Sequence, residues 1–180
     1  MADGILGIDV GGTGIKAGLV DVEHGTIIGE SREMPTPQPA NVDALFEVIE
    51  ELIQPWRGQY DLAGIAFPAM VRRGVVLSAV NVGDDWLYRD LGSHSRESLG
   101  TSVWTLNDCD AAAYAEMLYG AGRHEGGTIV MATLGTGVGT TLIVERQLVP
   151  NVELGMLAVR GKPAGQRVAN SVRRLSLIHI

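Results

Sequence analysis

The fold of this chain is decided by the stretch GIDVGGTGIK, residues 7–16. An apolar run ends at a carboxylate and a glycine turn, and apolar residues then alternate from position 15 to position 19. Alternation is typical of a strand, so we expect a hairpin at these glycines. A dinucleotide-binding GxGxxG loop requires a helix directly after the glycines. This stretch matches the spacing of that pattern, but the strand expected after the glycines argues against a dinucleotide-binding loop.

The glycine turn is the first candidate phosphate-binding loop. Glycines let backbone N–H groups approach an anion closely and form a concave nest. Asp9, at the end of the expected strand, predicts a Mg²⁺ site, with the ion bound directly or through water. A hairpin turn without a ligand is the alternative, but it does not account for the charged residues around the turn. The candidate phosphate ligands are Gly11, Gly12, Thr13, Gly14 and Lys16.

A second glycine loop, LGTGVGT at residues 134–140, follows another apolar run. Taken alone, GxGxG indicates a plain turn as readily as a phosphate site. The presence of the first loop favours phosphate binding for both. The candidate residues are Gly135, Thr136, Gly137 and Gly139.

Between the two loops, an expected strand ends at Asn107-Asp108 and an alanine-rich helix begins. Asp108 is either a helix N-cap or a general base that accepts the proton of an attacking hydroxyl group. In the second interpretation, Asn107 binds a sugar through a hydrogen bond. Asp110 competes for the role of base, but in a helix it would point away from Asp108.

The remaining pattern predicts an α/β fold with a mostly covered sheet. Helical spacing follows a candidate cap at Asn41, and a boundary near residues 100–110 would leave one glycine loop in each half. The three tryptophans, Trp56, Trp86 and Trp104, are expected to be packing residues, with sugar stacking at Trp86 as the alternative. Expected strands cover 5–10, 15–22, 26–30, 62–67, 74–80, 102–106, 128–134 and 139–144; expected helices cover 42–53, 93–99 and 108–119.

Composition narrows the function classes. The 180 residues carry a net charge of −7, which does not favour non-specific binding to nucleic acid or anionic membranes. We expect no transmembrane helix and no signal peptide, and hence a cytoplasmic protein. Cys109 is the only cysteine and the four histidines are scattered, so no zinc site is expected.

In order and spacing, these motifs resemble the ROK family of sugar kinases, and most closely its polyphosphate glucokinase subgroup. The resemblance covers roughly residues 5–174. It rests on residues 7–16, 106–108, 134–139 and 153–155, with 67–71, 79–82 and 149–151 supporting the subgroup.

The resemblance implies an actin-like, ribonuclease-H-like fold of two lobes, here residues 1–106 and an incomplete second lobe, 107–180. It implies that Asp108 is the catalytic base for the 6-hydroxyl group of glucose. The glycine loops would bind polyphosphate or ATP with Mg²⁺ near Asp9, and a homodimer is implied for the complete protein. The implied sugar-binding residues are Asn107, Glu153, Asn81, Pro68 and Ala69.

The sequence departs from the family pattern in three places. Met156 stands where the family usually has His, which leaves sugar specificity open. The cysteine-rich zinc motif of many ATP-using members is absent, as it is in the polyphosphate subgroup. The chain also stops early, so a truncated reading frame is expected. The alternatives are an ATP-dependent hexokinase for another sugar, an inactive sugar-binding fragment, and a regulator, for which the family needs a helix-turn-helix before Ile5.

Overall fold

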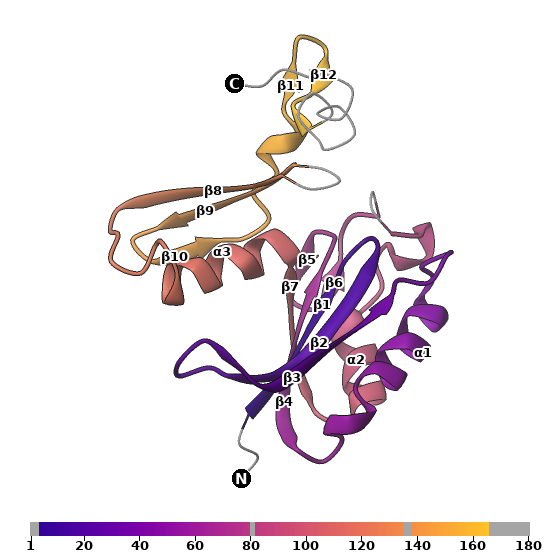
Figure 1. Cartoon of the computed structure of the whole chain (residues 1–180). Helices are drawn as coiled ribbons and strands as arrows, with labels where there is room; N and C mark the ends of the chain where they lie inside the picture. Colours follow the sequence, from indigo (N-terminus) through magenta and orange to yellow (C-terminus); the bar gives the residue numbers. More distant parts are fainter. Residues whose placement is uncertain (1–3, 80–81, 135–137, 166–180) are drawn as a thin grey trace, which may run out of the picture. The chain divides into compact units, whose positions relative to one another are not determined.

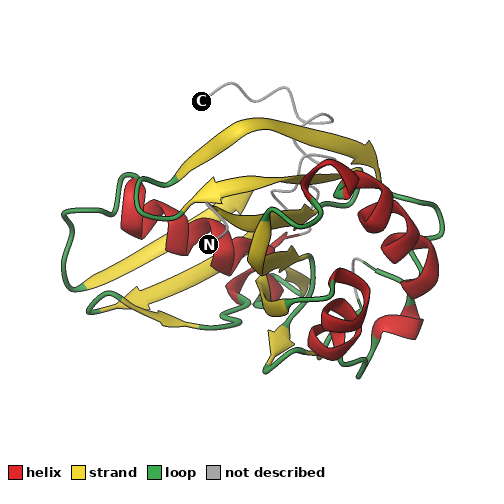
Figure 2. Cartoon of the chain, turned by 90° about the horizontal axis from the view of Figure 1, so that it is seen from below, coloured by secondary structure: helices red, strands yellow, loops and turns green. Residues whose placement is uncertain are grey.

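The computed structural model describes residues 4–79, 82–134 and 138–165. Internal contacts divide the chain into two compact units, Met1–Asp108 (unit 1) and Cys109–Ile180 (unit 2). The expected lobe boundary between residues 106 and 107 stays a prediction, because contacts within this chain do not define the lobes of the complete protein. Helices and strands occur in both units (Figure 2).

Unit 1 contains a five-stranded mixed sheet with the strand order β3-β2-β1-β4-β7 (Figure 1). The strands are β1 (Gly4–Val10), β2 (Gly14–Asp21), β3 (Thr26–Pro35), β4 (Tyr60–Phe67) and β7 (Ser102–Asn107). β1 pairs antiparallel with β2 and parallel with β4, and β4 pairs parallel with β7. The carboxyl ends of β1, β4 and β7 therefore lie along one edge of the sheet. Because β2 follows the first glycine loop directly, the dinucleotide-binding alternative is wrong.

Helices α1 (Val42–Leu52) and α2 (Leu91–Leu99) cover one face of this sheet and bury its apolar side chains. The alternation in the sequence sets that face, since Ile15, Ala17 and Leu19 of β2 are all buried. The expected cap of α1 is confirmed, because Asn41 Oδ1 accepts from the N–H of Ala44 at 2.9 Å. Helix α2 ends at Gly100, whose φ of 67° suits glycine.

The tryptophans of unit 1 differ in their surroundings. Trp86, in the short 3-10 helix η2 (Asp84–Trp86), is buried, and its ring centroid lies 4.8 Å from that of Phe67. Trp56, at the end of η1 (Gln54–Trp56), is also buried. Both are packing residues, as expected. Trp104 is 63% exposed, so the packing prediction is wrong for it: in β7 it is paired with Gly64, which has no side chain to cover it.

Of the expected strand at 74–80, only Val75–Val76 is a strand (β6), and it pairs with β5 (Val71–Arg72) in a short hairpin. The expectation is wrong for residues 77–79, which are not in a strand, and residue 80 lies outside the described residues. Val76, the last residue of β6, is hydrogen-bonded to the segment after η2. Its carbonyl accepts from the N–H of Tyr88 at 2.9 Å. Helix α2 begins two residues before the expected position, because Asp90 caps it by accepting from the N–H of Ser93.

Unit 2 contains the sheet β10-β9-β8 and the long helix α3 (Figure 1). Its small core joins Ala113 and Met117 of the helix to Ile143 of the sheet. The elements are α3 (Asp108–Tyr119), β8 (Thr128–Leu134), β9 (Val138–Val144), β10 (Gln147–Val149), η3 (Leu154–Met156), β11 (Ala158–Val159) and β12 (Lys162–Pro163). Among the described residues, no helix is long and apolar enough to span a membrane.

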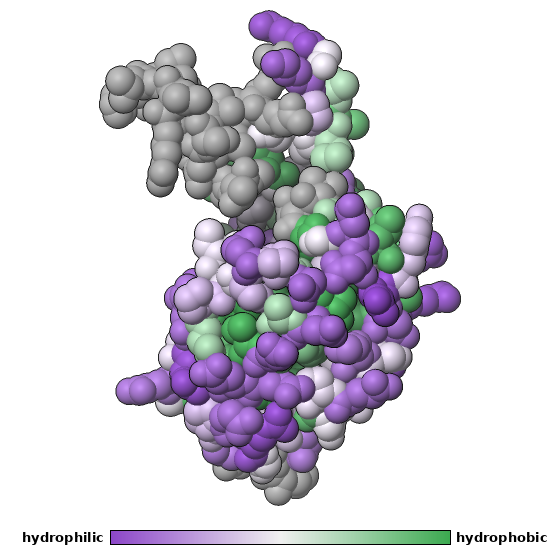
Figure 3. All heavy atoms as spheres, turned by 90° about the vertical axis from the view of Figure 1, so that its right-hand side faces the viewer, coloured by the Kyte–Doolittle hydropathy of each residue, from purple (hydrophilic) through white to green (hydrophobic). Residues whose placement is uncertain are grey.

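The visible surface of the described residues is mostly hydrophilic. On the face shown in Figure 3, hydrophilic side chains predominate and hydrophobic ones form small patches between them.

Candidate functional site

The first glycine loop is a tight turn between β1 and β2. The N–H of Gly11 donates to the carbonyl of Gly14 at 2.9 Å, which closes the turn. Thr36 fastens the turn from outside: its hydroxyl donates to the carbonyl of Gly11 at 2.6 Å, and its N–H donates to the carbonyl of Thr13 at 3.1 Å. Gly12 has open space where a Cβ would stand. The exposed tip of the loop is thus held rigid and left accessible to an anion.

Thr36 was missed by the sequence reasoning. It lies between Pro35 and Pro37, in a segment that suggests only an extended connection. A single polar residue between two prolines is the signal in the sequence that could have found it, and only the structure shows that this residue is buried.

Asp9 lies in a row of charges across the first three strands. It pairs with Lys16 in the β1–β2 register, and Lys16 pairs with Glu33 in the β2–β3 register. Although Asp9 is exposed as a residue, partial burial of its carboxyl group raises its pKa; Lys16 acts in the opposite direction and Glu33 in the same direction.

One carboxylate at this position suits Mg²⁺. The ion usually keeps several waters and takes one or two protein carboxylates together with substrate phosphates. The described residues contain no group of three or more His, Cys, Asp or Glu side chains that could bind a metal ion. A metal ion here would therefore need the substrate phosphates as further ligands. Asp9 beside the open glycine loop therefore fits a metal ion that arrives with the phosphoryl donor.

Asn107 and Asp108 lie at the end of β7 and the start of α3. The side-chain nitrogen of Asn107 donates to the carbonyl of Ala69 at 3.2 Å and to Oδ1 of Asp108 at 3.0 Å. Asn107 is only 7% exposed, whereas Asp108 is exposed. The carboxylate of Asp108 is therefore oriented by a buried neighbour and remains open to a substrate.

Pro68 and Ala69 follow β4 at the same edge of the sheet and are buried. The N–H of Ala69 donates to the carbonyl of Phe67 at 2.8 Å, which turns the chain sharply after the strand. In the sheet Asp9 pairs with Ala66, and Phe67 pairs with Asn107. Neighbouring strands lie about 4.8 Å apart, so β1 and β7 are separated by about 10 Å at this edge.

The topology of unit 1 thus brings the first loop, Asp9, the Pro68–Ala69 turn and Asn107-Asp108 to one edge. Asn81, expected near the sugar, lies outside the described residues.

Only the end of the second glycine loop is described, because Gly135, Thr136 and Gly137 lie outside the described residues. Gly139 packs against the first turn of α3: a Cβ at this position would lie 2.9 Å from Cβ of Cys109. The hydroxyl groups of Thr133 and Thr141 lie 3.4 and 3.2 Å from Sγ of Cys109. The close approach requires glycine, and it holds β9 against α3.

Asp110, the alternative base, is used inside unit 2. It is 1% exposed, and its Oδ1 accepts from the hydroxyl of Thr141 at 3.0 Å. Its Oδ2 accepts from the N–H of Asn151 at 2.7 Å. A carboxylate enclosed in this way cannot reach a substrate hydroxyl group, so the geometry favours Asp108 as the base.

The loop after β10 contains Glu153, which is half-buried. The hydroxyl of Thr140 donates to the carbonyl of Val152 at 2.6 Å and accepts from the N–H of Leu154 at 2.8 Å. Met156, in η3, is 57% exposed and brings a thioether rather than a hydrogen-bond donor to this region.

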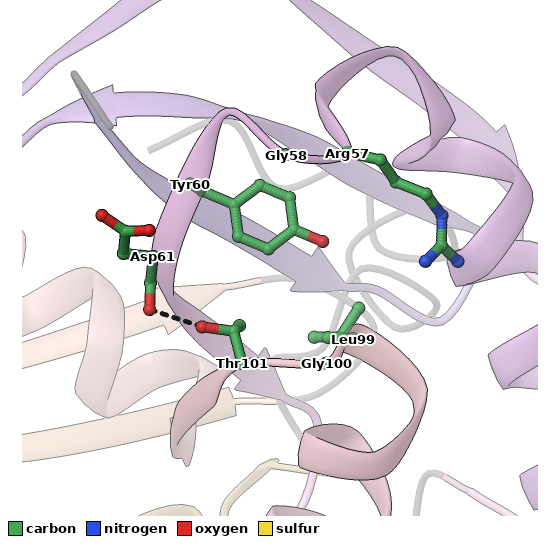
Figure 4. Close-up of a pocket in the computed structure, with 7 residues that line it drawn as sticks. All are labelled: Arg57, Gly58, Tyr60, Asp61, Leu99, Gly100 and Thr101. Carbon is green, nitrogen blue, oxygen red and sulfur yellow. Dashed lines mark hydrogen bonds between the residues drawn. The ribbon is translucent and has the colours of Figure 1, made fainter. Parts of the chain in front are cut away.

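One surface pocket lies at the other end of the sheet in unit 1. Arg57, Tyr60 and Thr101 line it (Figure 4), where the parallel strands β4 and β7 begin. The hydroxyl of Thr101 donates to the carbonyl of Asp61, and burial raises the pKa of Tyr60. In open α/β sheets ligands bind at the carboxyl ends of the strands, so this pocket is separate from the candidate site.

Comparison with known sequences connects this geometry to a family. The family described as "ROK family" matches residues 5–153. The polyphosphate glucokinase of Mycobacterium tuberculosis is 42% identical over 175 residues, which cover 93% of this chain and 63% of that protein. The polyphosphate glucokinase of Mycobacterium leprae is 42% identical over 173 residues, covering 93% and 52%. The chain therefore spans less than two thirds of the length of these curated relatives.

Solved structures show the same fold. The inorganic polyphosphate/ATP-glucomannokinase from Arthrobacter sp. strain KM superposes with a TM-score of 0.90 at 39% identity, covering 96% of this chain and 70% of that one. A ROK family glucokinase from Streptomyces griseus, solved in complex with glucose and AMPPNP, superposes with a TM-score of 0.80 at 27% identity, covering 93% and 58%. The chain has the α/β, actin-like fold of these sugar kinases.

Proposed function

Since this chain belongs to the ROK family, we propose that it supplies the catalytic base and sugar-binding residues of a Mg²⁺-dependent glucokinase. The reaction is transfer of a phosphoryl group from polyphosphate, ATP or both to the 6-hydroxyl group of glucose. One observation carries the proposal: Asp108 is exposed at the carboxyl edge of the sheet and is oriented by buried Asn107.

Asp108 acts as the general base. Its carboxylate accepts the proton of the glucose 6-hydroxyl group as the oxygen bonds to phosphorus and the bond from phosphorus to the leaving oxygen breaks. Asn107 donates to Oδ1 of Asp108, which orients the carboxylate, and in this proposal its amide also binds a sugar hydroxyl group. Glu153, Asn81 and the Pro68–Ala69 turn complete the sugar site in this proposal.

The glycine loops bind the phosphoryl donor. The N–H of Gly11 is used inside the turn, so the backbone N–H groups of Gly12 and Thr13 at the exposed tip, with Gly14 and Lys16 beside them, suit the oxygens of a phosphate chain. The second loop, at residues 135–139, supplies the matching donors in the complete enzyme. Asp9 would hold Mg²⁺, and the ion would supply positive charge that offsets the charge on the transferred group.

Polyphosphate is the favoured donor. The support is the name shared by the two mycobacterial relatives at 42% identity and the name of the Arthrobacter kinase, which includes both polyphosphate and ATP. A homodimer of the complete protein and a cytoplasmic location, both implied by the resemblance, stay predictions.

The test measures phosphate transfer to glucose, with polyphosphate and with ATP, by two proteins. One is the 180-residue chain, and the other is this chain fused to the C-terminal region of a polyphosphate glucokinase relative. We expect the fusion to transfer phosphate, and Asp108→Ala to lower its kcat by about 10²- to 10⁴-fold.

Asp61→Ala is the matched control, because Asp61 is exposed at the opposite end of β4. Normal turnover of the Asp108→Ala fusion would contradict the assignment of the base. If neither protein phosphorylates glucose with either donor, the proposed function is wrong.

A second candidate function follows from one residue of this chain. Exposed Met156 cannot donate a hydrogen bond to a sugar hydroxyl group, which favours a sugar other than glucose or a sugar-binding chain without turnover. Calorimetry separates these outcomes: glucose binding without phosphate transfer in the fusion identifies the inactive protein, and transfer to mannose in preference to glucose identifies the other specificity.

A further inference from the structure

We infer that Thr140 is a positioning residue for the sugar, because its hydroxyl fixes the backbone on both sides of Glu153. The inference rests on the proposed function, in which Glu153 binds hydroxyl groups of the substrate. It adds a physical link between the sugar loop and the strand that follows the second glycine loop.

One hydroxyl group makes both contacts. Thr140 Oγ1 donates to the carbonyl of Val152 at 2.6 Å and accepts from the N–H of Leu154 at 2.8 Å. These peptide groups lie directly before and directly after Glu153 in the chain. A hydroxyl can donate one hydrogen and accept others, so no apolar side chain of similar size can replace it.

Two further contacts hold the same loop, one on each side of Glu153. Before it, the N–H of Asn151 donates to the buried carboxylate of Asp110 at 2.7 Å. After it, Gly155 is so close to the carbonyl of Val138 that a Cβ would collide with that oxygen. Residues 151–155 are therefore held against the rest of unit 2 at three places. Of these three contacts, the one with Thr140 involves the peptide groups on either side of Glu153.

The adjacent threonines of β9 have different tasks. Successive side chains of a strand point to opposite faces. Thr141 is buried and contacts Cys109 and Asp110 of α3, whereas half-buried Thr140 contacts the loop after β10. The strand therefore connects helix α3, which follows Asp108, to the loop that contains Glu153.

This arrangement predicts that the position of Glu153 depends on the position of the start of β9. Hydrogen bonds between a carboxylate and hydroxyl groups are short and depend on accurate placement of the carboxylate. Gly139, a candidate donor ligand, is the residue directly before Thr140 in β9. A shift of the start of β9 would therefore move Glu153 with it.

The test measures glucose affinity by calorimetry on the 180-residue chain and on the fusion described above, for Thr140→Val, Thr140→Ser and a control. Thr128→Val is the control, because Thr128 is an exposed threonine at the start of β8, in the same hairpin. We expect Thr140→Val to weaken glucose binding by about 5- to 50-fold, in line with losing two hydrogen bonds. Thr140→Ser keeps the hydroxyl group and should stay within about twofold of the parent.

Kinetics on the fusion separate positioning from a loss of folding. The KM for glucose should rise in Thr140→Val while the KM for polyphosphate stays close to the parent value, and the melting temperature, although lowered by the lost hydrogen bonds, should stay above the assay temperature. In the background Glu153→Gln, adding Thr140→Val should raise the glucose Kd little further, because both changes act on the same carboxylate.

The inference is overturned if Thr140→Val binds glucose like the parent, or if its effect equals that of Thr128→Val. It is also overturned if the effects of Thr140→Val and Glu153→Gln multiply, or if glucose does not bind the parent proteins. Glucose binding without phosphate transfer overturns the proposed function alone, and the comparison of Kd values still decides the role of Thr140.

Discussion

Asn107 holds the carboxylate of Asp108: its side-chain nitrogen donates to Oδ1 of Asp108 at 3.0 Å. The same nitrogen donates to the carbonyl of Ala69 at 3.2 Å. The proposed base is thus connected through one buried amide to the turn after the neighbouring strand.

The first prediction concerns that amide. Asn107→Leu keeps the size of the side chain and removes these two hydrogen bonds, including the one that Asn107 donates to the carboxylate of Asp108. We expect kcat/KM for glucose to fall by about 10- to 100-fold, by analogy with other displaced catalytic groups. Steady-state kinetics on the fusion check this result, and a change in the KM for polyphosphate alone would contradict it.

The second prediction concerns Asp9 and pH. Partial burial raises the pKa of Asp9, so its carboxyl group keeps a proton to a higher pH than an ordinary aspartate. A protonated carboxyl group is a poor Mg²⁺ ligand. As pH falls towards the ordinary range near 4, Mg²⁺ affinity should therefore begin to weaken at a higher pH than an ordinary aspartate would allow.

The Mg²⁺ concentration at half-maximal rate, measured across this pH range, checks the prediction for Asp9. Asp9→Asn should require more Mg²⁺ and lose this part of the pH dependence. Stability and Mg²⁺ binding change in opposite directions with pH. Mg²⁺ affinity increases as Asp9 ionises, whereas the raised pKa means that the folded state loses stability as pH rises through that pKa. A Mg²⁺ requirement that is identical in parent and Asp9→Asn would rule out Asp9 as a ligand.

The third prediction concerns Gly155. A Cβ at this position would collide with the backbone carbonyl of Val138, and a backbone atom cannot move as a flexible side chain does. Gly155→Ala should destabilise unit 2 by about 1–3 kcal/mol, as overpacking does elsewhere. Gly126→Ala is the control, because a Cβ there meets nothing within 4 Å. Denaturant unfolding of the two variants should differ by this amount, and equal stabilities would show that the loop moves freely.

The fourth prediction concerns the start of α1. Asn41 Oδ1 accepts from the N–H of Ala44 at 2.9 Å. Asn41→Ala should lower the free energy of unfolding by about 1 kcal/mol, and Asn41→Asp, which retains the cap, should cost little. Urea titration measures both variants, and an Asn41→Ala chain as stable as the parent would show that packing alone sets this helix end.

Sequence patterns were reliable where one local rule determined the outcome. The alternation in β2, the cap at Asn41 and the helix end at Gly100 all appear as expected. Patterns failed at 77–79, where the expected strand ends early after β6, and at Trp104, which lies on the exposed face of β7. An apolar run does not specify its pairing partner, and an aromatic residue does not specify which face of a sheet is covered.

The sequence by itself predicted the family resemblance, the α/β class and most of the strands and helices that carry the candidate residues. It could do so because hydrophobic periodicity, capping residues and motif spacing are local properties of the chain. Only the tertiary structure showed that Asp110 is buried whereas Asp108 is exposed, since the contacts of Asp110 with Thr141 and Asn151 depend on residues far along the chain. The fastening of the first loop by Thr36 and of Glu153 by Thr140 was decided in the same way, because a hydroxyl group finds its partners only after distant segments have packed together.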